Sequence, residues 1–168
     1  GIGPMTQRMM EFAKARGLCR LIVVNKIDSR EARTEQVLAD IRETFGKACL
    51  PLNLPADGGQ SVVDCFYQAR GKATDFSSVE SAHTEIIDQV VEVDEQLMAL
   101  YLEQGEEISP EQLHDPFEQA LREDHLIPVC FCSAETGAGI PELLAVLARL
   151  APNPAEGNPP PFYKGEPG

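Results

Sequence analysis

An apolar run that ends abruptly in polar residues constrains the fold of this chain more than any other feature. Residues 21–24 are apolar and rich in β-branched side chains, and Asn25, Lys26 and Asp28 follow at once. Such a run is typical of a strand buried on both faces of a parallel sheet. Ligands of open parallel sheets bind at the carboxyl ends of the strands. The sequence therefore predicts an α/β fold with a ligand crevice at Asn25, Lys26 and Asp28.

These three side chains match the chemistry of guanine. A carboxylate such as Asp28 can accept from the N1–H and the 2-amino group of guanine together, whereas adenine would leave a buried carboxylate unpaired. The aliphatic stem of Lys26 could lie over the base while its ammonium stays in water. Asn25 can donate and accept, and so could fix the loop. The alternative is that three polar residues simply end a strand.

A second buried strand is predicted at residues 127–132, and it ends in Ser133, Ala134 and Glu135. Neighbouring parallel strands deliver their ends to one crevice, so this loop can lie beside Asp28. The N–H of Ala134 could donate to guanine O6, and the hydroxyl of Ser133 could steady the loop or Asp28. Ser133 is a poor candidate for a hydrolytic nucleophile because no glycine elbow surrounds it.

The rest of the chain alternates helix and strand signals. Helical spacing predicts helices over residues 6–16, capped by Thr6, and over 33–45, 79–104, a stretch begun by Ser109 and Pro110, and 139–150. An edge strand is predicted at residues 49–55, with a hairpin partner at 61–68 and a short strand at 73–76. A helix leading into a buried parallel strand implies an earlier strand, so we expect the chain to be part of something larger.

Charge is concentrated in one region. The chain has 27 acidic and 14 basic residues, for a net charge of −13, so we expect no direct binding of nucleic acid. Between Asp75 and Asp124 there are fifteen acidic residues and one basic residue, Arg122. This region is either a solvated helical face or a surface for a basic protein partner.

The cysteines indicate a reducing compartment. Five cysteines without paired spacing predict free thiols in a cytoplasmic protein, and the scattered histidines argue against zinc. We find no apolar signal segment and no run of membrane-spanning length, and therefore expect no membrane partner.

Residues 25–28 and 133–135 resemble the fourth and fifth guanine-nucleotide motifs of translational GTPases, in particular elongation factor G and elongation factor G-like proteins. The similarity runs from about residue 3 to residue 154 and includes stretches outside the motifs, such as residues 50–55, 94–98 and 128–130. The loop at Ser133 lacks the lysine usual in the housekeeping factor and is more like the G-like paralogues. Tetracycline-protection proteins and release factor three are related alternatives.

The resemblance implies the last strands of a P-loop GTPase-type parallel sheet, with an inserted α+β subdomain. About 105 residues separate Asp28 from Ser133, whereas a parallel crossover needs only a dozen or more. We therefore expect residues 1–46 and 125–151 to form the carboxyl-terminal half of a GTP-binding domain, residues 47–124 to form the insert, and the proline-rich residues 152–168 to be a linker to a following domain.

The resemblance also implies ligands and partners. GTP or GDP would be held by Asn25, Lys26, Asp28, Ser133, Ala134 and Glu135. The Mg²⁺ would be bound by parts of a longer parent. That parent would act on the ribosome in the cytoplasm, and the insert could contact the ribosomal stalk protein.

The phosphate half of a GTPase site is absent from this sequence. Neither G-x-x-x-x-G-K-[ST] nor D-x-x-G occurs in it. We therefore expect the chain alone to contain no catalytic residue, to hydrolyse no GTP and to bind nucleotide weakly. Two hypotheses remain: a guanine-recognition half of a GTPase domain, or an acidic interaction module without chemistry. The strand at residue 21 would also present an unpaired edge, which invites dimerisation.

Overall fold

The computed structural model of this protein describes residues 2–104, 108–153, 155 and 158. It combines a parallel sheet with helices, which confirms the predicted α/β fold class. In chain order they are α1 (Pro4–Ala15), β1 (Ile22–Val24), α2 (Thr34–Phe45), β2 (Cys49–Pro51), β3 (Asn53–Ala56), β4 (Ser61–Asp64), α3 (Val79–Val91), α4 (Glu95–Gln104), α5 (Pro110–Arg122), β5 (Ile127–Phe131) and α6 (Ile140–Arg149).

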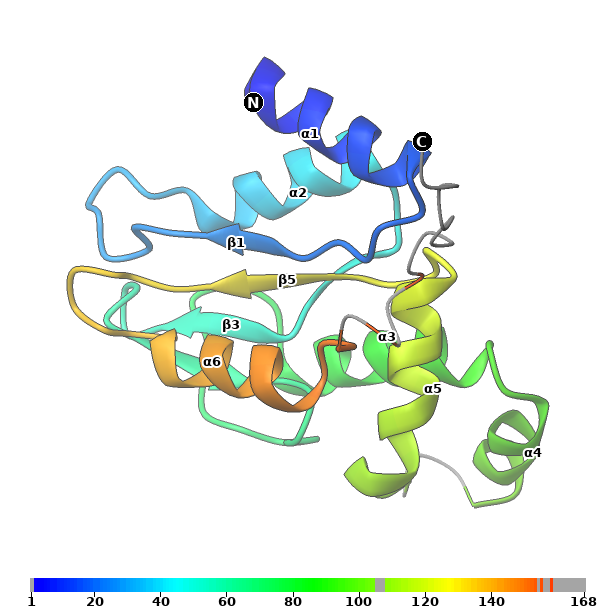
Figure 1. The fold of residues 1–168 in the computed structure, drawn as a ribbon. Helices are drawn as coiled ribbons and strands as arrows, with labels where there is room; N and C mark the ends of the chain where they lie inside the picture. Colours follow the sequence, from blue (N-terminus) through cyan, green and yellow to red (C-terminus); the bar gives the residue numbers. More distant parts are fainter. Residues whose placement is uncertain (1, 105–107, 154, 156–157, 159–168) are drawn as a thin grey trace, which may run out of the picture.

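A parallel sheet of β1, β5 and β2, in that order, organises the fold. Ile22 of β1 is paired with Val129, and Cys49 of β2 is paired with Ile127. All five residues of the central strand β5 are buried, as its continuous apolar run predicts. β1 is an edge strand among the described residues, with a neighbour on one side only, and Val23 is 45% exposed, so the prediction of a strand buried on both faces is wrong for β1. The carboxyl ends of β1 and β5 point to the same end of the molecule (Figure 1).

The strand predicted at residues 49–55 is instead two strands in two sheets. β2 ends at Pro51 in the parallel sheet, and β3 begins two residues later in an antiparallel hairpin with β4. The division falls at Asn53. The side chain of Asn53 forms hydrogen bonds with the backbone of β5, in the position that the backbone of a neighbouring strand would otherwise occupy. The hairpin itself was predicted, but β4 ends at Asp64 rather than at residue 68.

No strand forms at residues 73–76, so that prediction is wrong. Residues 73 and 74 have no regular structure and residues 75 and 76 form a bend, and the N–H of Asp75 donates to the carbonyl of Pro55 in the hairpin at 2.8 Å. The carboxylate of Asp75 accepts from the turn of the hairpin. One backbone bond and a side-chain anchor take the place of a strand ladder.

Two helix predictions also need correction. The helix predicted over residues 79–104 is broken into α3 and α4, because the carboxylate of Asp94 accepts from the N–H groups of Gln96 and Leu97 and starts a new helix. α1 begins at Pro4 and has no side-chain cap, so the cap expected from Thr6 is absent. The signal at Ser109 is confirmed as a full capping box with Gln112.

Apolar side chains fill both faces of the sheet. α1 and α2 cover one face, and α3, α5 and α6 lie on the other side of the molecule (Figure 1). The larger cluster joins Phe66 and Phe117 to Cys130 of the sheet. Residues on both sides of the boundary expected at 124 thus share one core, and the division into two units stays a prediction. Most of the expected linker, residues 152–168, lies outside the described residues.

Among the described residues, no helix combines the length and the apolar character that crossing a bilayer would require.

Candidate functional site

The loops that follow β1 and β5 are bonded to each other through their backbones. The N–H of Cys132 donates to the carbonyl of Val24 at 2.9 Å, and the N–H of Ile27 donates to the carbonyl of Cys132 at 3.3 Å. Lys26, between them, has a φ of +66°, which is uncommon for a residue with a side chain. The two polar strand ends therefore meet at one place, with residues 25–28 folded back toward the end of β5.

The side chain of Asn25 adds a further contact between the two loops. Oδ1 of Asn25 accepts from the N–H of Lys26 at 2.8 Å and from the N–H of Ala134 at 3.0 Å. The loop-fixing role predicted for Asn25 thus extends to the second loop. The N–H of Ala134, expected to serve guanine O6, here donates to Asn25. A base oxygen would have to share or replace that bond.

Ser133 holds its own loop. Its side chain is fully buried, and its Oγ accepts from the N–H of Thr136 at 3.1 Å. Its backbone N–H donates to Ala138, and its carbonyl accepts from Gly137. The sequence suggested that Ser133 could steady either its own loop or Asp28. In the structure its hydrogen bonds lie within its own loop, and none joins it to Asp28. Glu135 is exposed to solvent.

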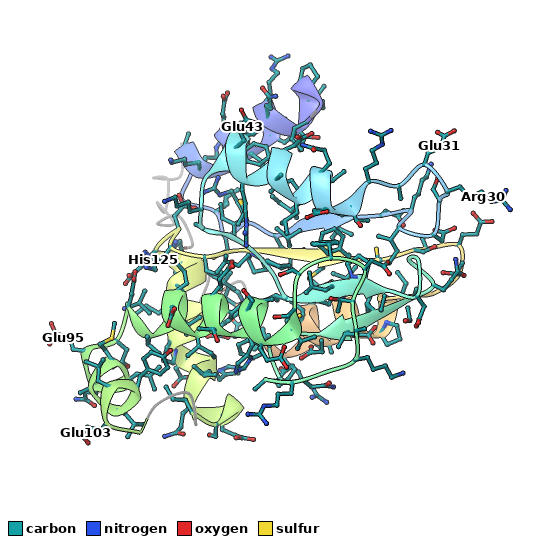
Figure 2. All side chains as sticks on the ribbon, turned by 180° about the vertical axis from the view of Figure 1, so that it is seen from behind. Arg30, Glu31, Glu43, Glu95, Glu103 and His125 are labelled. Atoms are coloured by element: carbon teal, nitrogen blue, oxygen red, sulfur yellow. The ribbon has the colours of Figure 1, made fainter. Side chains whose placement is uncertain are left out.

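The carboxylate of Asp28 is half-buried and accepts no hydrogen bond from any residue that the structure describes. It lines a groove of about 880 Å³ together with Arg33, Gln60 and Asp75. Asn25, Lys26 and Ala134 do not line this groove. The side chains of Arg30 and Glu31, in the loop that leads from Asp28 to α2, point away from the body of the molecule (Figure 2). The acceptor oxygens of Asp28 therefore remain available to a ligand.

The turn between β3 and β4 supports the loop that carries Asp28, and no local sequence pattern indicated this contact. Gly59 lies so close to the peptide bond between Ile27 and Asp28 that it has no space for a β-carbon. Its N–H and that of Gly58 each donate to the carboxylate of Asp75 at 2.9 Å. The adjacent glycines Gly58 and Gly59 predicted a turn, but they did not indicate which part of the chain the turn would contact.

No metal cluster is evident in the part of the chain that the structure describes: no three His, Cys, Asp or Glu side chains come together to hold an ion. The five cysteines are free thiols. Burial raises the pKa of Cys65 and Cys130 to about 12 and that of Cys49 to about 11, so these thiols stay protonated at neutral pH.

Comparison with known proteins gives consistent matches. A family model described as "Elongation factor Tu GTP binding domain" matches residues 1–153. An "Elongation factor G-like protein" of Thermotoga maritima is 30% identical over 98% of this chain and 25% of its own length. One of Mycobacterium tuberculosis is 31% identical over 93% of this chain and 23% of its own length.

A solved crystal structure from Thermus thermophilus is also similar, with a TM-score of 0.75 and 32% sequence identity. The match covers 93% of this chain and 26% of the other. The chain therefore spans about a quarter of the length of the proteins that it matches.

Proposed function

This chain belongs to the elongation factor Tu GTP-binding domain family of translational GTPases, and from that premise we propose that it recognises the guanine base of GTP and GDP. The observation that carries the proposal is the bond from Ala134 to Asn25, which joins two motif loops that lie more than a hundred residues apart in the sequence. In the first of these loops, the carboxylate of Asp28 accepts no hydrogen bond from the described residues.

Each motif residue has a definite task in this proposal. Asp28 accepts from N1–H and the 2-amino group of the base, while the stem of the exposed Lys26 covers one face of the ring. The N–H of Ala134 donates to O6. Asn25 and Ser133 hold the two loops, and Glu135, exposed on the second loop, completes the set of nucleotide-binding residues.

The phosphates and Mg²⁺ are assigned to other parts of a longer parent. The chain has no phosphate-loop motif, and the described residues contain no cluster of metal-binding side chains. We propose that the parent is a cytoplasmic, ribosome-associated, elongation factor G-like GTPase. Without charge-assisted phosphate bonds of about 1.5–3 kcal/mol each, this chain alone should bind nucleotide weakly.

Amide NMR titration of this chain with GDP and ADP tests the base-recognition proposal. GDP at millimolar concentration should shift the amide signals of Asp28 and Ala134, and ADP should not. Equal responses to the two nucleotides, or a GDP response confined to other residues, would reject guanine recognition by these loops.

A second candidate function is recruitment of a ribosomal partner, such as the stalk protein, by the acidic region. The observation that favours it is the position of α4, which projects from the body at the end opposite the Asp28 loop (Figure 1). On α4 the side chains of Glu95 and Glu103 point outward (Figure 2), and Leu102 is 78% exposed. Purified stalk protein should bind the wild-type chain and not the double variant Glu95→Lys, Glu103→Lys. Equal capture of both would reject this surface.

A further inference from the structure

One feature outside the two motifs touches the loop that carries Asp28: the turn between β3 and β4. A β-carbon added to Gly59 would collide with the carbonyl oxygen of Ile27, lie 2.6 Å from its carbonyl carbon and lie 3.2 Å from the N–H nitrogen of Asp28. Gly59 is buried and has a φ of +78°, in the region that favours glycine. The backbone of the turn therefore sets how far the peptide before Asp28 can move.

The carboxylate of Asp75 fixes this turn. Its two oxygens accept from the N–H groups of Gly58 and Gly59, each at 2.9 Å. The N–H of Asp75 donates to the carbonyl of Pro55 in β3 at 2.8 Å. Hydrogen bonds to a charged acceptor are stronger than neutral ones. Asp75 thus ties the turn back to its own hairpin and holds Gly59 against Ile27.

The same hairpin also contacts the second motif loop. Asn53 in β3 bonds to both backbone groups of Phe131, two residues before Ser133. A β-carbon at Gly139, which closes that loop, would lie 3.2 Å from a methyl group of Val62 in β4. One hairpin therefore lies against both loops of the candidate base site.

We propose that the β3–β4 hairpin positions the base-reading loops, with Gly59 as the positioning residue for Asp28 and Asp75 as the residue that holds Gly59. This inference rests on the proposed guanine recognition and extends it to residues outside the motifs. Its consequence is specific: the hairpin sets how well Asp28 reaches the 2-amino group. Discrimination between guanine and hypoxanthine, which lacks that group, therefore depends on Gly59 and Asp75.

Gly58 offers a matched control for Gly59. Both residues have positive φ, so alanine strains the backbone at either position, but a β-carbon at Gly58 meets nothing within 4 Å. The experiment measures GDP and IDP binding by amide NMR titration for the wild-type chain and for Gly58→Ala, Gly59→Ala and Asp75→Asn. The asparagine keeps the size of Asp75 but can accept only one of the two turn bonds. Asp75→Asn still tests the proposal if Gly59→Ala does not fold.

We expect the wild type to prefer GDP over IDP by about tenfold, since one bond to a charged carboxylate is lost with IDP. Gly59→Ala should reduce the preference to about twofold and Gly58→Ala should keep it, with Asp75→Asn between them. A positioning change alters the ratio, whereas a loss of folded protein lowers both affinities alike.

Two outcomes count against these proposals, and they differ. A wild-type chain that does not distinguish GDP from IDP overturns guanine reading by Asp28 and this inference with it. A wild type that distinguishes them, together with unchanged ratios in folded Gly59→Ala and in Asp75→Asn, overturns the positioning role alone. A uniform loss of both affinities in these variants also overturns it.

Discussion

Replacement of Asn53 should show how much free energy one buried amide contributes to this fold. β2 pairs with β5 as far as Val129, and beyond that point the backbone of Phe131 has the side chain of Asn53 as its partner. Oδ1 of Asn53 accepts from the N–H of Phe131 at 2.7 Å, and Nδ2 donates to its carbonyl at 3.0 Å. The side chain is 2% exposed, so water cannot take over either bond.

The expected cost follows from these two bonds. Asn53→Ala leaves one donor and one acceptor of Phe131 buried without partners, at about 1–3 kcal/mol each, so the free energy of unfolding should fall by about 2–6 kcal/mol. Urea denaturation followed by circular dichroism measures this change. Hydrogen exchange of the Phe131 amide should accelerate in the variant, because that amide loses its acceptor.

An exposed amide provides the control for Asn53. Gln36 on α2 donates to Asp40 at 2.8 Å on the surface, and Gln36→Ala should cost less than about 0.5 kcal/mol. Asn53→Asp keeps an acceptor but loses the donor and buries a charge, so it should be at least as destabilising as Asn53→Ala. If Asn53→Ala costs no more than Gln36→Ala, the side chain does not replace a strand partner and our account of the junction is wrong.

Three further predictions concern single side chains. In a parent that binds GTP tightly, Asp28→Asn should shift preference from guanine toward xanthine, because the new amide can donate to a C2 carbonyl; unchanged selectivity would reject base reading by Asp28. Burial raises the pKa of Asp64, so its protonated form favours the folded state and that contribution is lost as pH rises through the raised pKa. Asp64→Asn should therefore gain stability relative to wild type in urea melts between about pH 4 and pH 7, and a constant difference would contradict this. Thiol labelling of the native chain at mildly alkaline pH should modify Cys19 first, because it is only half-buried, while urea should expose all five thiols. Rapid labelling of Cys49, Cys65 or Cys130 in the native chain would contradict their burial.

Much of the fold follows from local signals in the sequence. The apolar runs before Asn25 and Ser133 indicated two parallel strands, although only β5 is buried, and the capping box at Ser109 started a helix where expected. The break between α3 and α4 could also have been found, because Asp94 followed by Glu95 and Gln96 is a helix-start signal. The continuous apolar stripe outweighed that signal, since the two helices keep their apolar sides on one core.

The remaining differences depend on contacts between residues far apart in the chain. The division of residues 49–55 into two strands depends on the bonds from Asn53 to Phe131, which lies 78 residues away. The close approach of Gly59 to Ile27 is likewise invisible to any local pattern. For the candidate site, the sequence predicted that the two loops meet, but not that Ala134 would donate to Asn25.

The hairpin described above has a thermodynamic consequence for regulation. Its residues Leu54 and Val63 belong to the same apolar cluster as Ile86 of α3 and Phe117 of α5, while its turn abuts the Asp28 loop. Linkage is reciprocal. A protein partner that binds those helices and favours one hairpin geometry would change the affinity for nucleotide by a certain factor, and nucleotide would change the affinity for that partner by the same factor. If nucleotide binds at the proposed site, that site and the acidic region would therefore be coupled through the hairpin and the shared apolar cluster.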